Sequence, residues 1–122
     1  MATVDLTQAN FEATVGGSEI AILDFWAPWC GPCKAFGPTY EEVSANHADI
    51  LFGKVNTEIE QGLGAHFNIR SIPTLMVIRD NIVIFSQAGA LPKASLEDLI
   101  TQIRAVDMDE VRAAVAKEAA KS

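Results

Sequence analysis

The sequence predicts an α/β fold, a three-layer sandwich in which a central mixed β-sheet is covered by helices on both faces. Strand and helix patterns alternate as β-α-β-α-β early in the chain, which implies parallel strands joined by right-handed crossovers. Two β-rich runs separated by two residues then predict a hairpin that extends the sheet with antiparallel strands. With 122 residues, of which 49% are apolar, the chain suits one domain with its own hydrophobic core.

The chain is expected to begin with a short strand and a helix. The strand ends at Val4. Thr7 is a candidate N-cap for the helix, because a threonine hydroxyl can accept a hydrogen bond from a free backbone N–H. Phe11 and Val15 are spaced by four residues along that helix, and the glycine pair at 16–17 ends it.

The centre of the predicted sheet is an apolar run at residues 20–26, which has the length and flanks of a buried strand. A helix is expected from Cys33 to about Asn46. Pro38 lies inside this helix and has no backbone N–H, so we expect it to kink the helix or to interrupt its hydrogen bonds. Residues 50–56 form the next predicted strand.

A weaker helix and a hairpin follow. Two glycines weaken the helix expected at 58–67, since each costs about 1 kcal/mol relative to alanine. Residues 74–79 and 82–86 are β-rich and are linked by Asp80 and Asn81. A two-residue link of this kind indicates a tight turn, although asparagine tolerates a positive φ less readily than glycine.

The last helix of the predicted domain covers residues 92–106. Its apolar residues lie on one stripe, as expected for a helix that packs on a sheet. The stripe consists of Leu96, Leu99, Ile100, Ile103 and Val106. We therefore expect one domain at 1–106 and a separate C-terminal helical extension at 107–122.

The extension allows two interpretations. Asp107, followed three residues later by Glu110, resembles a capping box, and Met108, Val111 and Val115 form a thin apolar stripe on an alanine-rich segment. The first interpretation is a marginal surface helix that frays at its end. The second is a helix that docks on the domain or on a partner.

Composition narrows the possible partners and the compartment. A formal net charge of −7 argues against nucleic acids and anionic membranes as partners. The N-terminus has neither the basic nor the apolar segment of a secretory signal, and no apolar run approaches the roughly 20 residues that span a bilayer. Only two cysteines are present, both in one motif, so no secreted disulfide framework is indicated. We expect a cytoplasmic protein.

The two cysteines lie where the central strand passes into the second helix, in the sequence Trp29-Cys30-Gly31-Pro32-Cys33. Cysteines three residues apart in the first turn of a helix share one face, so their sulfurs can bond or separate locally. Unpaired backbone N–H groups at a helix start stabilise a thiolate and lower its pKa. The outer cysteine is therefore expected to be a nucleophile at neutral pH. A nucleophilic thiolate beside a second cysteine indicates thiol–disulfide redox chemistry.

Asp24 is the only charged residue in an otherwise apolar strand. If its side chain faces inward, desolvation raises its pKa toward neutrality, where a carboxyl group can exchange protons. The hypothesis is that Asp24 accepts the proton of Cys33. The alternative is a structural aspartate on the polar face of the strand.

Four segments in their order and spacing are similar to the thioredoxin family over about residues 2–106. They are 24–27 (DFWA), 29–34 (WCGPCK), 69–74 (IRSIPT) and 89–91 (GAL). The resemblance implies a thioredoxin-like fold and a thiol–disulfide oxidoreductase that reduces disulfides in cytosolic proteins. It further implies that Cys30 is the exposed attacking thiolate and that Cys33 resolves the mixed disulfide.

The resemblance also implies roles for the residues around the cysteines. Gly31 lets another backbone approach closely, and Pro32 pre-sets φ in the first helical turn. Pro73, in cis, lies with Ile72 opposite the cysteines. An apolar docking groove is bordered by Trp29, Ile72, Gly89 and Ala90. Lys54 matches a lysine that lies near the buried aspartate in the family.

The family also implies two kinds of partner: a thioredoxin reductase that draws electrons from NADPH, and oxidised substrate proteins. The protein itself is expected to be a monomer. No bound cofactor is expected. Residues 56–58 depart from many relatives at the border of the groove, so they are expected to alter which substrates fit.

Other classes of function remain open at this point. An oxidase or isomerase would use the same chemistry, although oxidising relatives usually carry a histidine between the cysteines. A binding module would use the groove as a platform and need no redox step. A zinc site requires four ligands, and His47 and His66 lie in segments not obviously near the motif, so we expect no metal and interpret both histidines as surface residues.

Overall fold

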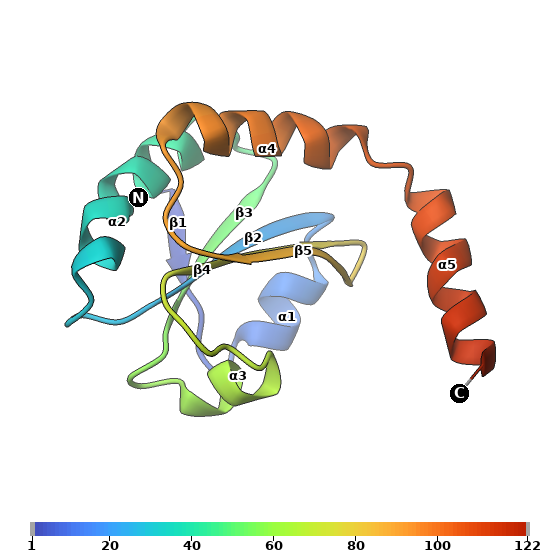
Figure 1. The fold of residues 1–122 in the computed structure, drawn as a ribbon, viewed down its shortest axis with the longest axis horizontal. Coiled ribbons are helices and arrows are strands. Elements are labelled where there is room, and N and C mark those ends of the chain that lie inside the picture. Colours follow the sequence, from blue (N-terminus) through green and yellow to red (C-terminus); the bar gives the residue numbers. More distant parts are fainter. Residues whose placement is uncertain (1, 122) are drawn as a thin grey trace.

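The computed structural model describes residues 2–121, and within them five strands form one sheet flanked by helices (Figure 1). In chain order the elements are β1 (Thr3–Asp5), α1 (Phe11–Gly16), β2 (Ile20–Trp26), α2 (Gly31–Ser44), β3 (Leu51–Asn56), α3 (Gln61–His66), β4 (Thr74–Arg79), β5 (Ile82–Ala88), α4 (Lys93–Ala105) and α5 (Met108–Lys121). The strand order is β1-β3-β2-β4-β5.

The sheet is mixed, which confirms the predicted fold class. β3 pairs in parallel with β1 and with β2, while β4 pairs antiparallel with β2 and with β5. β2 is therefore the central strand. Asp80 and Asn81, which link β4 to β5, both have a positive φ, of 52° and 65°. These values match the tight turn that two-residue hairpins favour.

Side chains of β2 alternate between the two faces, as the period of a strand requires. Ile20 and Ile22 belong to a core that includes apolar residues of α2 and α4. Ala21, Leu23 and Phe25 belong to a second core with residues of α1 and α3. Figure 1 shows the same division, with α2 and α4 on one side of the sheet and α1 and α3 on the other.

Tyr40 ties α2 to the sheet. It is fully buried, and its hydroxyl lies 2.8 Å from the carbonyl oxygens of both Ile22 and Gly53, in β2 and β3. Its ring packs at an angle against those of Phe36 and Phe52. The helix that carries the cysteines is thereby anchored to the two central strands.

Several element boundaries differ from the predictions. α1 is assigned from Phe11, after a turn that begins at Thr7, so the regular helix starts later than predicted. Thr7 nevertheless makes the expected capping hydrogen bond: its Oγ1 accepts from the N–H of Asn10 at 3.2 Å, and Asn10 Oδ1 accepts from the N–H of Thr7 at 2.8 Å. α2 begins two residues before Cys33 and continues through Pro38.

Two further boundaries differ. α3 covers only the middle of the expected helix, because the chain at 57–59 forms a turn in which the N–H of Glu60 donates to the carbonyl of Asn56. β5 is two residues longer than predicted, since its pairing with β4 continues to Ala88, opposite Thr74.

The C-terminal helices are joined to the hairpin. The Arg79 guanidinium donates to the carbonyl oxygens of Ile103 at 2.8 Å and Val106 at 3.2 Å, which caps the end of α4. Met108 at the start of α5 is buried, and Arg112 forms a salt bridge with Asp80 at 2.9 Å. The N-terminal part of α5 therefore contacts the domain.

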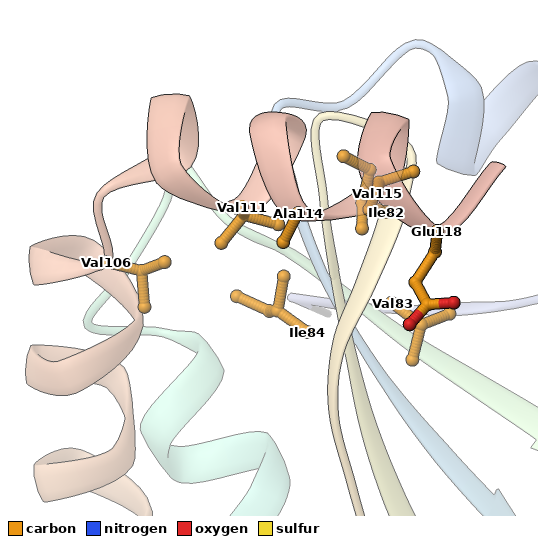
Figure 2. A pocket seen from close by; sticks show the side chains of 8 residues that line it. All are labelled: Ile82, Val83, Ile84, Val106, Val111, Ala114, Val115 and Glu118. Carbon is orange, nitrogen blue, oxygen red and sulfur yellow. The ribbon is translucent and has the colours of Figure 1, made fainter. Parts of the chain in front are cut away.

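Beyond these contacts α5 and β5 border an apolar groove of about 470 Å³ (Figure 2). It is lined by Ile82, Val83, Ile84, Val106, Val111, Ala114, Val115 and Glu118. None of the helices at residues 2–121 is long and apolar enough to cross a bilayer.

Candidate active site

The cysteine pair lies at the start of α2, where the chain leaves β2. Cys30 is the N-cap of α2, with an extended backbone, and its Sγ accepts a hydrogen bond from the N–H of Cys33 at 3.3 Å. Cys30 and Cys33 form a disulfide, with their Cα atoms 5.2 Å apart. Pro32 stands in the first turn, where no N–H is needed. A helix start of this form stabilises negative charge on the capping sulfur once the disulfide is reduced.

Cys30 is less accessible than expected. Cys30 is 5% exposed and Cys33 is 3% exposed, so the expectation of an exposed Cys30 is wrong for this disulfide-bonded form. Both cysteines pack with Ala27, and Ile72 covers the same cluster. Trp29, which directly precedes Cys30, is 68% exposed.

The loop before β4 lies against the cysteines. The peptide bond between Ile72 and Pro73 is cis, as the resemblance implied, and the carbonyl oxygen of Ile72 lies 3.8 Å from Sγ of Cys30. The carbonyl of Pro73 accepts a hydrogen bond from the N–H of Gly89 at 2.7 Å. Gly89 has a φ of +108°, which favours glycine at this position.

A groove of about 410 Å³ lies beside the cysteines. Of the four predicted border residues, Trp29 and Ile72 line it. Gly89 and Ala90 are exposed and do not line it. Its other lining residues are Thr57, Gln61, Gly64, Ala65, Ile69, Arg70 and Ser71. Thr57 belongs to the segment 56–58 that was expected at the border of the groove, but the sequence predictions missed the other six residues, which come from α3 and the loop after it and carry no local motif of reactive residues.

Asp24 is buried and faces the α2 side of the sheet. It is 1% exposed, and by the alternation along β2 it shares a face with Ile22. Burial raises the pKa of Asp24 from 3.8 to about 7, while the nearby Lys54 ammonium partly opposes this rise. Neither carboxyl oxygen has a hydrogen-bond partner within residues 2–121. The alternative of an aspartate on a polar strand face is therefore wrong.

Lys54 stands beside this carboxyl group. It is paired in register with Asp24 across the parallel β2 and β3 ladder. Its Nζ lies 4.6 Å from the centroid of the Trp26 ring, within cation–π range. The ammonium is thus held at the edge of the site by an aromatic face.

The histidines lie away from the cysteines. His66 is exposed, but His47 is partly buried: its Nε2 lies 2.6 Å from Glu97 Oε1, and its Nδ1 lies 3.1 Å from Arg104 Nη2. Both histidines therefore lie at the surface, as expected, but His47 is a partly buried member of a cluster with Glu97 and Arg104. Across the described part of the chain, no three side chains of His, Cys, Asp or Glu gather in a way that could hold a metal ion.

A mixed sheet that presents a CxxC disulfide at a helix start, beside a cis-proline loop and a buried carboxyl group, defines an α/β dithiol–disulfide oxidoreductase. Residues 2–102 match the family model described as thioredoxin. The chain is 52% identical over 120 residues to a putative thioredoxin 2 of Streptomyces coelicolor, an alignment that covers 98% of this chain and 90% of that protein.

A further relative and a solved structure point to the same family. A thioredoxin of Haemophilus influenzae is 44% identical over 99 residues, covering 80% of this chain and 92% of that protein. The solved structure of a Plasmodium falciparum thioredoxin superposes with a TM-score of 0.75 at 34% identity, covering 80% of this chain and 96% of that one. The chain therefore belongs to the thioredoxin family, and it is a protein-disulfide reductase that works through the Cys30–Cys33 dithiol/disulfide pair.

Proposed function

We propose that Cys30 attacks the disulfides of cytosolic proteins and that Cys33 resolves the resulting mixed disulfide. The observation that carries this assignment is the hydrogen bond from the N–H of Cys33 to Sγ of Cys30 at the N-terminus of α2. In the reduced protein this N–H and the helix dipole stabilise a thiolate at Cys30. Within residues 2–121 no backbone N–H is seen to donate to Sγ of Cys33 in this way, so Cys33 remains a thiol until the second displacement.

The exchange proceeds in two displacements. The Cys30 thiolate attacks one sulfur of the substrate disulfide, and the other substrate sulfur leaves as a thiolate. Sγ of Cys33 then loses its proton and attacks Sγ of Cys30, and the second substrate thiolate leaves. The substrate gains two electrons, takes up two protons and becomes a dithiol, while Cys30 and Cys33 become the disulfide.

Asp24 is the group that accepts the proton of Cys33 in the second displacement. Its pKa of about 7 lets it take and release a proton at neutral pH. Its side chain faces the α2 layer, which carries Cys33. Lys54 tunes this carboxyl group, because a nearby ammonium stabilises the ionised form.

The substrate segment docks beside Trp29 and Ile72, with Gly31 and Pro32 allowing its backbone to approach and Pro73 offering its backbone across from the cysteines. Gly89 and Ala90 lie outside the groove at Trp29 and meet the substrate segment on the side of Pro73, whose carbonyl accepts from the N–H of Gly89. Electrons return from an NADPH-dependent thioredoxin reductase. The protein acts as a cytoplasmic monomer, with a thioredoxin domain at 1–106 and a helical extension at 107–122.

Reduction of insulin disulfides by NADPH and thioredoxin reductase tests this proposal. The wild type turns over, and Cys30→Ser is inactive. Cys33→Ser traps a covalent complex with the substrate, which is visible by non-reducing electrophoresis, whereas Cys30→Ser traps none. A covalent complex that forms through Cys33 in the Cys30→Ser variant would reverse the assignment of the two roles.

Asp24→Asn tests the proton acceptor separately. The variant is expected to form the mixed disulfide at the wild-type rate and to release it at least about tenfold more slowly at pH 7, since general base catalysis contributes on the order of 100-fold or more. Rapid-quench measurement of the trapped intermediate separates the two steps. An unchanged release rate would remove Asp24 from the mechanism.

A further inference from the structure

Three grooves adjoin one another along α5, the β4–β5 hairpin, α1 and α3. The first is the groove of about 470 Å³ in which Val111, Ala114 and Val115 of α5 face the start of β5 (Figure 2). Val83 of β5 also lines the second groove, of about 250 Å³, which lies between α1 and the hairpin. Phe11 of α1 lines both the second groove and the third, of about 380 Å³, which lies between α1 and α3. We call the three grooves together the hairpin surface.

The hairpin surface carries apolar side chains that solvent reaches. Five large apolar side chains are exposed among residues 2–121, and two of them, Val83 and Val115, lie here, each 47% exposed. Phe11 and Phe67 line the second groove, and their ring centroids are 5.4 Å apart. Exposed apolar side chains gathered over adjoining grooves are typical of a surface that binds another protein.

The charged residues of the hairpin surface are all of one sign. Glu12 lines the second and third grooves, and Glu118 lines the first. In the part of the chain that the structure describes, no lysine or arginine lines any of the three grooves, and Glu12 forms no salt bridge. Arg112 of α5 is already paired with Asp80 and Asp109, at 2.9 and 2.6 Å. The hairpin surface therefore favours positive charge on a bound molecule at two separate places.

The hairpin surface is separate from the redox site. It shares no lining residue with the groove at Trp29, because α3 turns different residues to each: Gly62 and His66 line the hairpin surface, whereas Gly64 and Ala65 line the groove at Trp29. The hairpin also lies at the end of β4 that pairs with the start of β2, while α2 and its cysteines follow the end of β2 (Figure 1). A molecule bound at the hairpin surface therefore leaves the redox site uncovered.

We propose that the hairpin surface docks a partner protein through a segment that carries apolar side chains together with lysine or arginine. The apolar side chains of that segment fill the groove between α5 and β5, and its cations lie against Glu118 and Glu12. The reductase is thereby attached to the partner while Cys30 and Cys33 continue to exchange disulfides. Docking here needs none of the roles proposed for the residues around the cysteines.

Two synthetic peptides test the chemistry of the docked segment. Both form an amphipathic helix with leucine on one face, and the other face carries lysine in one peptide and glutamate in the other. Titration of the full chain, followed by two-dimensional amide spectra, gives both the Kd and the place of binding. The lysine peptide is expected to shift the resonances of α1, β5 and α5 and to leave those of Trp29 and Ile72 in place. The glutamate peptide is expected to bind at least about tenfold more weakly, because its charges are repelled where those of the lysine peptide are attracted.

Point variants test the two properties of the surface separately. Glu12→Lys and Glu118→Lys are each expected to raise the Kd of the lysine peptide about fivefold, the size of a reversed surface charge. Val115→Ser is expected to raise it about threefold by removing a half-exposed apolar contact. Asp98→Lys is the matched control: it changes the net charge equally at an exposed position of α4, outside the three grooves, and should leave the Kd within about twofold. Insulin reduction at the wild-type rate shows that each variant is folded.

The same titrations contain the results that would overturn the proposal. Equal affinity for the two peptides would remove the charge preference, and a Kd within twofold of wild type in both Glu12→Lys and Glu118→Lys would place binding elsewhere. Shifts at Trp29 and Ile72 in place of shifts at β5 and α5 would mean that the peptide uses the substrate groove. Insulin reduction in the presence of saturating lysine peptide is expected to continue at the wild-type rate, and its loss would show that the two sites are not separate.

Discussion

The buried carboxyl group of Asp24 makes the stability of the fold depend on pH. Its pKa is about 7 in the folded protein and close to 3.8 when the chain is unfolded. Between these values the folded state holds a proton that the unfolded state has lost, so the free energy of unfolding falls as the pH rises from about 4 to 7. Above pH 7 both states are ionised and this contribution stays constant.

Asp24→Asn is therefore expected to stabilise the oxidised protein at pH 8 by up to about 4 kcal/mol, on the order of three pKa units of differential protonation. At pH 4 the difference from wild type nearly vanishes. Urea unfolding at both pH values measures it. Asp98→Asn, at an exposed helix position, is the control and should show no such pH dependence. Equal stabilisation at both pH values would contradict an ionised, buried carboxylate.

Tyr40 shows how a single hydroxyl can serve two strands. Its O–H lies 2.8 Å from two buried carbonyl oxygens, in β2 and in β3. Tyr40→Phe keeps the ring contacts but leaves these acceptors with one donor fewer, so we expect a loss of about 1–2 kcal/mol in the free energy of unfolding. Denaturant titration of the variant measures this loss. A neutral result would mean that the backbone ladder alone satisfies both carbonyls.

At the scale of elements, α5 is joined to the domain mainly through its first turns. Met108 is 6% exposed, whereas Val115 is 47% exposed. Truncation after Val106 is expected to lower the free energy of unfolding by about 2 kcal/mol, chiefly by removing the buried Met108 side chain. Insulin reduction should be unchanged, because α5 contacts the hairpin turn and β5 and none of the residues around the cysteines.

Two point variants serve as controls for the truncation. Met108→Ala is expected to account for most of the loss in stability, and Val115→Ala to change stability by less than about 0.5 kcal/mol. An unchanged stability after truncation would return α5 to the interpretation of a frayed surface helix. A loss of insulin reduction would instead show that the extension acts at the redox site.

The sequence predicts elements well where the signal is local. The apolar run of β2, the stripe of α4 and the two-residue turn at Asp80 each determine their own structure within a few positions. Boundaries are harder to predict because they depend on distant partners. α2 starts at Gly31 because Cys30 caps it, and the carbonyls at the end of α4 are capped by Arg79, which belongs to β4.

The same contrast between local signals and distant partners holds for the residues of the site. The CxxC motif and the lone aspartate are visible in the sequence because each is unusual among its neighbours. The hydrogen bond of 2.7 Å from Trp29 Nε1 to Glu58 Oε2 is not, since it joins side chains 29 residues apart with no local pattern that links them. The resemblance placed Ile72 opposite the cysteines, but burial of Cys30 was missed, because it depends on how closely that distant loop packs against the sulfurs.

At the scale of the molecule, β2 joins the two cores, because its alternate residues belong to the layers on opposite faces of one sheet. Neither core can lose its packing without exposing one face of β2. We therefore expect residues 1–106 to unfold in one cooperative step, with far-ultraviolet circular dichroism and tryptophan fluorescence giving the same midpoint. Separate midpoints would show that the two faces unfold independently.

The disulfide is expected to shift that single transition without changing its cooperativity. It links residues only three apart, so closing the loop removes little entropy from the unfolded chain, which corresponds to about 2 kcal/mol. Reduction should therefore lower the free energy of unfolding by about this amount and leave the denaturant m-value unchanged. Because folding and redox state are linked, the same difference makes the folded protein a weaker oxidant than its unfolded chain. Equal stability of the oxidised and reduced forms in parallel urea titrations would contradict this linkage.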